Sequence, residues 1–187
     1  LLELAGVLVE TIDEEAMRHH IDETIAILSA LLMDPCSDVQ LRACKLASDF
    51  LTRFKGLVFH FTTRIARAIL NPLASKKSPI KIAAIQTLSD LLYCGTWKYT
   101  SDVFDILVGY KDPNYVQIRE FYESSNNYNY FATLINHQNV NVREAFLRMV
   151  GDLLISLPDR TDVETRLIPY LLTGLFDPFP EIQVNYF

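Results

Sequence analysis

The sequence predicts an all-α fold in which helical hairpins stack side by side into an α-α superhelix, or solenoid. Three segments share one pattern, which opens on a β-branched residue and closes with Asp, an apolar residue and Leu: 39–51, 80–92 and 142–154. A fourth copy begins at Ile182. The first and last intervals between starts are about 40 residues, a period typical of stacked helical hairpins. Such arrays expose long surfaces.

Each repeat is expected to contain an outer helix, a turn and an inner helix. The first outer helix is predicted over 21–33, because apolar residues recur there at helical spacing: Ile21, Ile25, Leu28 and Leu32. It should end before Pro35, since the residue before a proline is pushed out of the α region. Ser37 or Asp38 is expected to cap the inner helix, and Gly56 to stop it.

The second unit repeats this plan. Its outer helix is predicted over 57–70, with Asn71-Pro72 as the break. Its inner helix should begin at Ser78-Pro79, because proline is tolerated in a first turn. Residues 1–10 look like the tail of an earlier inner helix.

The interval from Ile80 to Val142 is longer than the other two and indicates one additional, abbreviated unit between positions 93 and 139. Ser101 or Asp102 should cap a helix through Gly109, and Asp112-Pro113 should break it. A short helix over 114–123 and a loop over 124–127 are then expected. The alternative is an irregular loop over 111–127, which we disfavour because connections between helices are usually shorter.

The last complete unit is predicted over 128–157, and Asp162 should cap an outer helix that ends at Asp177-Pro178. The chain starts at Leu1 and ends within a copy of the pattern, so we expect a fragment of a longer protein. We therefore predict one solenoid of about five repeats, cut at both ends. Its boundaries are 1–20 (partial), 21–56, 57–98, 99–127 (short), 128–160 and 161–187 (partial).

Composition disfavours several classes of function. The formal net charge is -6 and the pI is about 5.2, whereas nucleic-acid binding depends on Lys and Arg neutralising phosphates. No apolar run is long enough to predict a transmembrane helix. Cys36, Cys44 and Cys94 form no Cys-x-x-Cys pair, so they are expected to be free thiols packed as small hydrophobes in a reducing compartment.

No residue pattern predicts catalysis, a cofactor or a metal. His19 and His20 are adjacent, so on a helix they point about 100° apart and cannot chelate on one face. His60 lies between two phenylalanines and is read as a core or interface residue. Neither a glycine-rich phosphate loop nor a nucleophile elbow is present in the sequence. We therefore expect a protein that is not an enzyme and has no cofactor.

Asp49, Asp90 and Asp152 fall in register in the three complete copies. Stacked helices are about 10 Å apart, too far for these carboxylates to share one metal. Each either bonds within its own helix or lines an acidic inner surface that would favour a basic partner. On the second reading, charge reversal at Asp49 and Asp90 should weaken partner capture without lowering the melting temperature.

Aromatic residues crowd into the segment from Tyr93 to Phe131, which holds 11 of the 21 in the chain. Packing around the short unit is the favoured role for Phe104, Phe121, Tyr130 and Phe131. Packing and partner binding are equally open for a second set, because aromatics are common at binding hot spots. This set is Trp97, Tyr99, Tyr115 and Tyr122.

These patterns resemble the HEAT-repeat (armadillo-like) superfamily, whose signature is an Asp-Pro turn followed by Val-Arg-x-x-Ala. Its forms here are Asp34-Pro35 with Val39-Gln40, Ile80-Lys81, Val142-Arg143, and Asp177-Pro178 with Ile182-Gln183. In that family the turn Asp and the inner-helix Arg of adjacent repeats form a polar ladder. Here the repeats with a turn Asp carry Gln40 or Gln183, and those with Lys81 or Arg143 carry Ser75 or His137. The resemblance therefore does not imply a continuous ladder.

A narrower resemblance links five short segments to the HEAT-repeat axonemal dynein assembly factors: 118–123, 129–132, 142–146, 157–160 and 170–175. It implies a non-catalytic, protein-binding scaffold in the cytoplasm of ciliated cells, where dynein arms are preassembled before transport into cilia. The implied partners are proteins, such as dynein chains and chaperones, and not nucleic acid, membranes or a small-molecule substrate. The alternative is another HEAT adaptor, such as a nuclear transport receptor or a phosphatase scaffold subunit.

Overall fold

A computed structural model describes residues 2–95, 97–108, 128–157 and 161–185, and all regular structure in these ranges is helical. The predicted all-α fold of helical repeats is therefore confirmed. The chain divides into two compact units, Leu1–Tyr99 and Thr100–Phe187, with the division inside one helix. The two units are described separately below.

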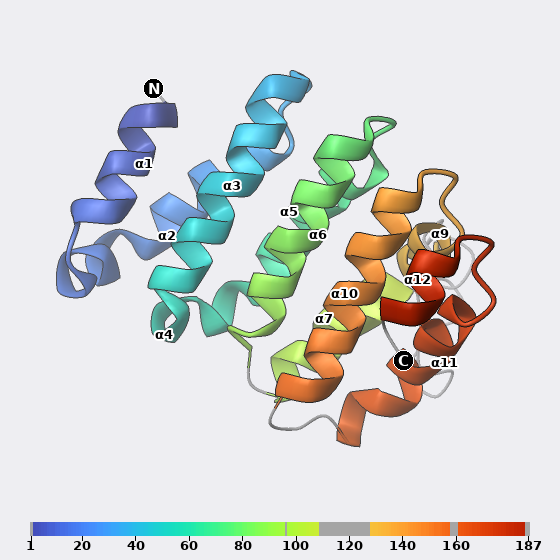
Figure 1. Cartoon of the computed structure of the whole chain (residues 1–187). Coiled ribbons are helices and arrows are strands. Elements are labelled where there is room, and N and C mark those ends of the chain that lie inside the picture. The colour runs from blue at the N-terminus through green and yellow to red at the C-terminus, as the bar shows by residue number, and fades with distance from the viewer. Residues whose placement is uncertain (1, 96, 109–127, 158–160, 186–187) are drawn as a thin grey trace, which may run out of the picture. The chain divides into compact units, whose positions relative to one another are not determined.

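The first unit consists of two layers of helices (Figure 1). Helices α1, α3 and α6 lie side by side in one layer, and α2 and α5 lie together in the other. Helix α2 also packs against α3, and α5 against α6, which gives the expected stacked hairpins. The elements are α1 (Leu2–Thr11), α2 (Glu14–Leu32), α3 (Ser37–Arg53), α4 (Lys55–Val58), the 3-10 turn η1 (Phe59–Phe61), α5 (Thr62–Ala74) and α6 (Ser78–Leu92).

The core of the first unit lies between its stacked hairpins. Ala43 and Ala47 on α3 are fully buried, and their small side chains let α6 approach closely. Phe50 and Leu88 pack without solvent exposure in the same layer. Burial of side chains of this size contributes about 1.5–3 kcal/mol each, so the α3–α6 contact is a main source of stability in this unit.

Helix α2 begins seven residues before the predicted start, at Glu14 instead of Ile21. Its first two turns are mostly polar, with Met17 as a single buried apolar side chain, so the apolar periodicity did not extend to them. The start is set by Asp13, whose extended backbone and carboxylate cap the helix by accepting a hydrogen bond from the Ala16 amide at 2.7 Å.

Helix α3 is capped differently from the prediction. Ser37 and Asp38 lie within its first turn, and the N-cap residue Cys36 makes no side-chain capping bond. The Asp34 carboxylate instead accepts a bond from the Cys36 amide at 2.7 Å and holds the turn. Gly56 does not stop α3, which ends at Arg53; it lies inside α4.

Asn71-Pro72 does not break the second outer helix, because α5 continues to Ala74. Tertiary contacts hold this last turn in place. The Asn71 side chain bonds to Gln40 and to the carbonyl of Met33 in the preceding hairpin, at 3.1 and 3.4 Å, and Pro72 and Leu73 are buried. The predicted start of α6 at Ser78-Pro79 is confirmed.

The second unit holds α7 (Trp97–Val108), α9 (Tyr130–Ile135), α10 (Val140–Ser156), α11 (Thr161–Gly174) and α12 (Pro180–Asn185). Helix α9 packs on α10 and α11, and α10 packs on α11. The two helices approach closely at Gly174, where an added Cβ would lie 3.0 Å from Leu147 Cδ1.

Two predicted helix starts in this unit are wrong. Ser101 and Asp102 lie inside α7, which begins at Trp97, and Asp162 lies in the first turn of α11, which begins at Thr161. Helix α11 ends at Gly174, three residues before Asp177. The expected Asp112-Pro113 break, the short helix over 114–123 and the loop over 124–127 lie outside the described residues.

Candidate functional site

The predicted aspartates occupy different environments. Asp49 on α3 and Asp152 on α10 are exposed, whereas Asp90 on α6 is half-buried. Asp90 accepts hydrogen bonds from the Ser48 hydroxyl of the preceding inner helix and from Gln86 in its own helix. Asp90 therefore joins two repeats, whereas the carboxylate of Asp49 projects into solvent.

Burial raises the pKa of Asp90 above its ordinary value, and the nearby charge of Asp49 adds to this rise. The hydrogen bonds from Ser48 and Gln86 oppose it only in part. Reversing the charge at Asp90 would consequently disturb folding, so the expectation that the melting temperature does not fall is kept for Asp49 alone.

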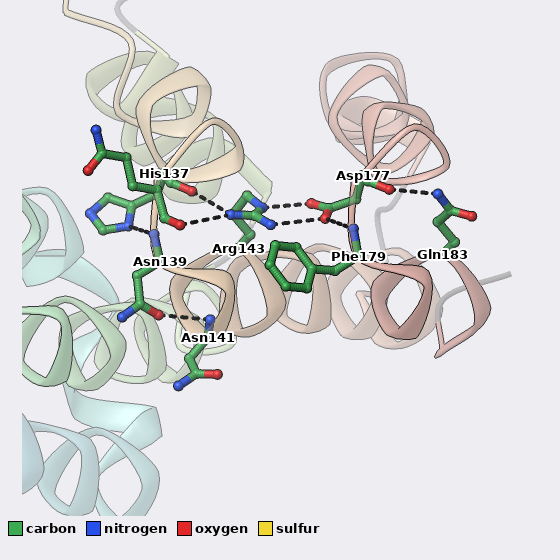
Figure 2. Close-up of polar contacts among 8 residues, drawn as sticks. His137, Asn139, Asn141, Arg143, Asp177, Phe179 and Gln183 are labelled. Carbon is green, nitrogen blue, oxygen red and sulfur yellow. Dashed lines mark hydrogen bonds and ion pairs between the residues drawn. The ribbon is translucent and has the colours of Figure 1, made fainter.

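The polar ladder is present in the second unit as a buried ion pair (Figure 2). Arg143 of α10 donates from Nε and Nη2 to the two carboxylate oxygens of Asp177, at 2.6 and 2.9 Å. The two side chains are 7% and 4% exposed. Hydrogen bonds from Arg143 hold the pKa of Asp177 below its ordinary value. This bidentate, charge-assisted geometry is the strongest form of such a pair.

The same register position plays a related role in four of the repeats that the structure describes. We call Gln40, Lys81, Arg143 and Gln183 the ladder positions. Each donates to a carbonyl of its own turn, at distances between 2.6 and 3.5 Å: Leu32 for Gln40, Leu73 for Lys81, His137 for Arg143 and Asp177 for Gln183. Burial lowers the pKa of the Lys81 ammonium. Gln40 also reaches Asn71 of the next repeat, as Arg143 reaches Asp177.

The ladder is not evident from the sequence within single repeats, because no repeat holds both a base at the ladder position and an acid in its own turn. In the structure the base of one repeat binds the turn acid of the next one, 34 residues further along the chain. Pairing Arg143 with Asp177 across the repeat boundary would have found the contact. These hydrogen bonds connect the turns of neighbouring repeats, so the ladder has a structural role.

The aromatic segment includes a packed cluster, and Tyr130 beside it is partly exposed and contacts Tyr128 with ring centroids 4.7 Å apart. Phe104, Phe131 and Phe146 are fully buried. The Phe131 ring contacts those of Phe104 and Phe146, and Tyr170 contacts Phe131 and Phe146, with ring centroids 5.1–6.0 Å apart. The packing role predicted for Phe104 and Phe131 is therefore confirmed. The side chains of Trp97 and Tyr99 are not described, and Phe121, Tyr115 and Tyr122 lie outside the described residues.

A groove that the sequence does not predict lies between the outer helices α2 and α5. It measures about 650 Å³, and α2 contributes its lining residues Ala26, Ser29, Ala30 and Met33. The opposite wall comes from η1 and α5: His60, Phe61, Thr63, Arg64, Arg67 and Ala68. Arg64 and Arg67 are visible in the sequence, and so are the small residues of α2. The groove they form together becomes evident only when α2 and α5 are known to be neighbours.

The three cysteines are free thiols, and two of them are packed as predicted. Burial raises the pKa of Cys44 to about 11 and that of Cys94 to about 12. Cys36 is exposed, contrary to the expectation that all three would be packed, because it lies in the turn before α3.

Among the described residues, no group of three or more His, Cys, Asp or Glu is placed to hold a metal ion. His20 lies 3.6 Å from Glu23 on the exposed surface of α2. Of the helices in the described ranges, none has the length and apolar character needed to cross a membrane.

Comparison with known proteins gives one consistent result. The family model described as "Dynein axonemal assembly factor 5-like, TPR repeats" matches residues 1–120 and 125–186. Dynein axonemal assembly factor 5 of Xenopus laevis is 26% identical over 183 residues, covering 98% of this chain and 19% of the relative. The human protein of that name is 24% identical over 184 residues, covering 98% and 18%. No solved structure matches the chain.

The chain thus spans about a fifth of the length of the curated relatives it matches. The family description uses the term TPR, for which repeats of about 34 residues are usual. The interval from Val39 to Ile80 instead has the length typical of HEAT repeats. Both are stacked helical hairpins, so the two descriptions agree on the architecture.

Proposed function

Since the chain belongs to the dynein axonemal assembly factor 5-like family, we propose that it is a non-catalytic scaffold for the cytoplasmic preassembly of axonemal dynein arms. The observation that carries this proposal is the family match over residues 1–120 and 125–186. The printed names of the relatives refer to dynein assembly. The helical repeats support it, because such arrays present extended binding surfaces.

The proposed mechanism is positional. Separate hairpins contact separate parts of a dynein chain or of a chaperone that carries it. Once one contact is made, the others form at high effective concentration, so modest contacts add up to stable capture. Asp49 is proposed as one contact, since its exposed carboxylate would attract a basic segment. The other proposed contacts are Asp90, Asp152, Trp97, Tyr99, Tyr115 and Tyr122.

The test is affinity capture with the whole chain from an extract of ciliated cells, followed by mass spectrometry. Dynein chains and chaperones should be enriched over a control made from an unrelated helical-repeat protein. Enrichment of nuclear-transport GTPases or phosphatase catalytic subunits, without dynein chains, would instead favour the HEAT-adaptor alternative.

Asp49→Lys gives a residue-level test of the same proposal. It should reduce dynein capture several-fold, because an attractive charge becomes repulsive, and should not lower the melting temperature. Glu15→Lys is the matched control: Glu15 is also exposed but lies on α2 in the other layer. A lower melting temperature for Asp49→Lys with normal capture would contradict the role given to Asp49.

A further inference from the structure

The groove between α2 and α5 has an electrostatic character opposite to that of the chain. The chain carries a net charge of -6, yet the described lining of the groove contains two arginines, a histidine and no carboxylate. The remaining lining residues are small or apolar, including Ala26, Ala30 and Met33 on one wall and Phe61 on the other.

The two arginines differ in their partners. Arg64 forms an ion pair with Asp22, with 2.8 Å between Nη1 and Oδ1, so part of the charge of Arg64 is already neutralised. Arg67 is exposed, and the structure gives it no acidic partner among the residues it describes. A guanidinium in this position can donate a bidentate pair of hydrogen bonds to an incoming carboxylate.

The groove also contains an unsatisfied polar group. Ser29 is 7% exposed, and its hydroxyl lacks a hydrogen-bond partner within the described part of the chain. A buried hydroxyl in a folded protein is normally bonded. Over its described lining, the groove thus combines a cation without an acidic partner and apolar walls, while the Ser29 hydroxyl oxygen itself is closed to solvent.

We propose that this groove binds a short acidic segment of a partner protein. An apolar side chain of the segment lies against Met33 and Phe61, and a neighbouring Asp or Glu pairs with Arg67. A volume of about 650 Å³ accommodates such an anchor, since ligand sites usually measure about 300–1,000 Å³. The proposal deepens the scaffold function and rests on it, because it names one surface and the chemistry of its occupant.

A peptide-display selection on the whole chain tests the groove. Random 12-residue peptides are selected against the wild-type chain, with the Ala30→Trp variant used for counter-selection, because an indole at this exposed position fills the groove. The recovered peptides should carry Asp or Glu next to an apolar residue. Their affinity is then measured by fluorescence polarisation at low and high salt.

Arg67→Glu should weaken binding of the best peptide by about tenfold or more, as expected for loss of a charge pair and introduction of a repulsive charge. Lys45→Glu is the matched control, because Lys45 is an exposed cation on α3, away from the groove, and its replacement changes the net charge equally. It should alter affinity by less than about twofold, since exposed charges at a distance are screened.

Several outcomes would overturn the proposal. Recovered peptides without acidic residues would contradict the assigned chemistry, and equal losses for Arg67→Glu and Lys45→Glu would show a non-specific charge effect. Self-association abolished by Arg67→Glu, with no peptide recovered, would identify a second copy as the occupant. Dynein capture is measured in parallel. If dynein capture is retained but no peptide is recovered, the groove proposal alone is contradicted. If a peptide binds but dynein chains are not captured, the proposed scaffold function is contradicted.

Discussion

At the scale of single residues, two buried or half-buried carboxylates have opposite effects on stability. Asp177 faces the Arg143 guanidinium, and its pKa is lowered. Asp90 faces only neutral donors in Ser48 and Gln86, and its pKa is raised by burial. The first favours folding in its charged form, whereas the second is easier to bury with a proton.

Removing one partner of the Arg143–Asp177 pair should be strongly destabilising. Arg143→Ala leaves a buried carboxylate unpaired, and such changes cost about 3–5 kcal/mol. The double variant Arg143→Met/Asp177→Leu should recover most of that loss, because apolar replacements leave no buried charge. Urea unfolding measures both. Arg18→Ala, at an exposed pair with Glu14, is the control and should change stability by less than about 0.5 kcal/mol.

The two carboxylates should also give opposite dependences on pH. Because the folded-state pKa of Asp177 is depressed, its contribution is present above the unfolded value of about 3.9 and is lost as pH falls through the folded pKa. Because that of Asp90 is raised, its ionised form carries a cost at neutral pH that disappears as pH falls.

Asp90→Asn should therefore raise the free energy of unfolding at pH 7, and this gain should vanish towards about pH 4. Asp177→Asn should lower it at pH 7, with the difference shrinking in strong acid. Urea unfolding at a series of pH values distinguishes the two. A gain for Asp90→Asn that persisted unchanged in acid would contradict the assigned cause.

At the scale of helices, the start of α2 depends on one side chain. Asp13→Ala removes the bond from the Ala16 amide and should cost about 1 kcal/mol. Asp38→Ala is the matched control, since Asp38 lies in the first turn of α3 but makes no capping bond. Thermal unfolding should show a clearly smaller effect for Asp38; equal effects would contradict the assignment of the cap.

The inner helices could be predicted from sequence, and the ends of the outer ones could not. Val39, Ile80 and Val142 open strong apolar stripes, and each lies two residues after the start of its helix, α3, α6 or α10. Helix α2 begins in polar sequence, and α5 passes through Pro72 because Asn71 is held by the neighbouring hairpin. The hydrogen bonds of Asn71 to the preceding hairpin thus outweigh the tendency of proline to end the helix.

The candidate surfaces were predicted less completely than the fold. Asp49 and Asp152 are exposed, as a place on a solvent-facing surface requires, but the bond from Ser48 to Asp90 depends on the distance between two helices. The groove is formed by residues from two helices that belong to successive repeats. Periodicity identifies the apolar face of a helix, but it does not show which part of that face its neighbours leave uncovered.

At the scale of the whole molecule, stability should vary along the chain. Helix α1 leaves Leu4, Val7 and Leu8 more than half exposed, whereas α3 and α6 bury most of their apolar side chains. We expect amide hydrogens of 2–11 to exchange first and those of 43–51 and 84–92 last, because local opening follows burial. Exchange measured by mass spectrometry checks this order, and uniform protection would contradict it.

The unequal burial of the three thiols makes the native chain convenient to label. The thiolate is the form that reacts with a maleimide dye, and burial keeps Cys44 and Cys94 protonated at neutral pH. A fluorophore should therefore attach at Cys36 alone, three positions beyond Met33 on the groove wall. The unaltered sequence thus supplies a single optical reporter beside the surface where an acidic segment is expected.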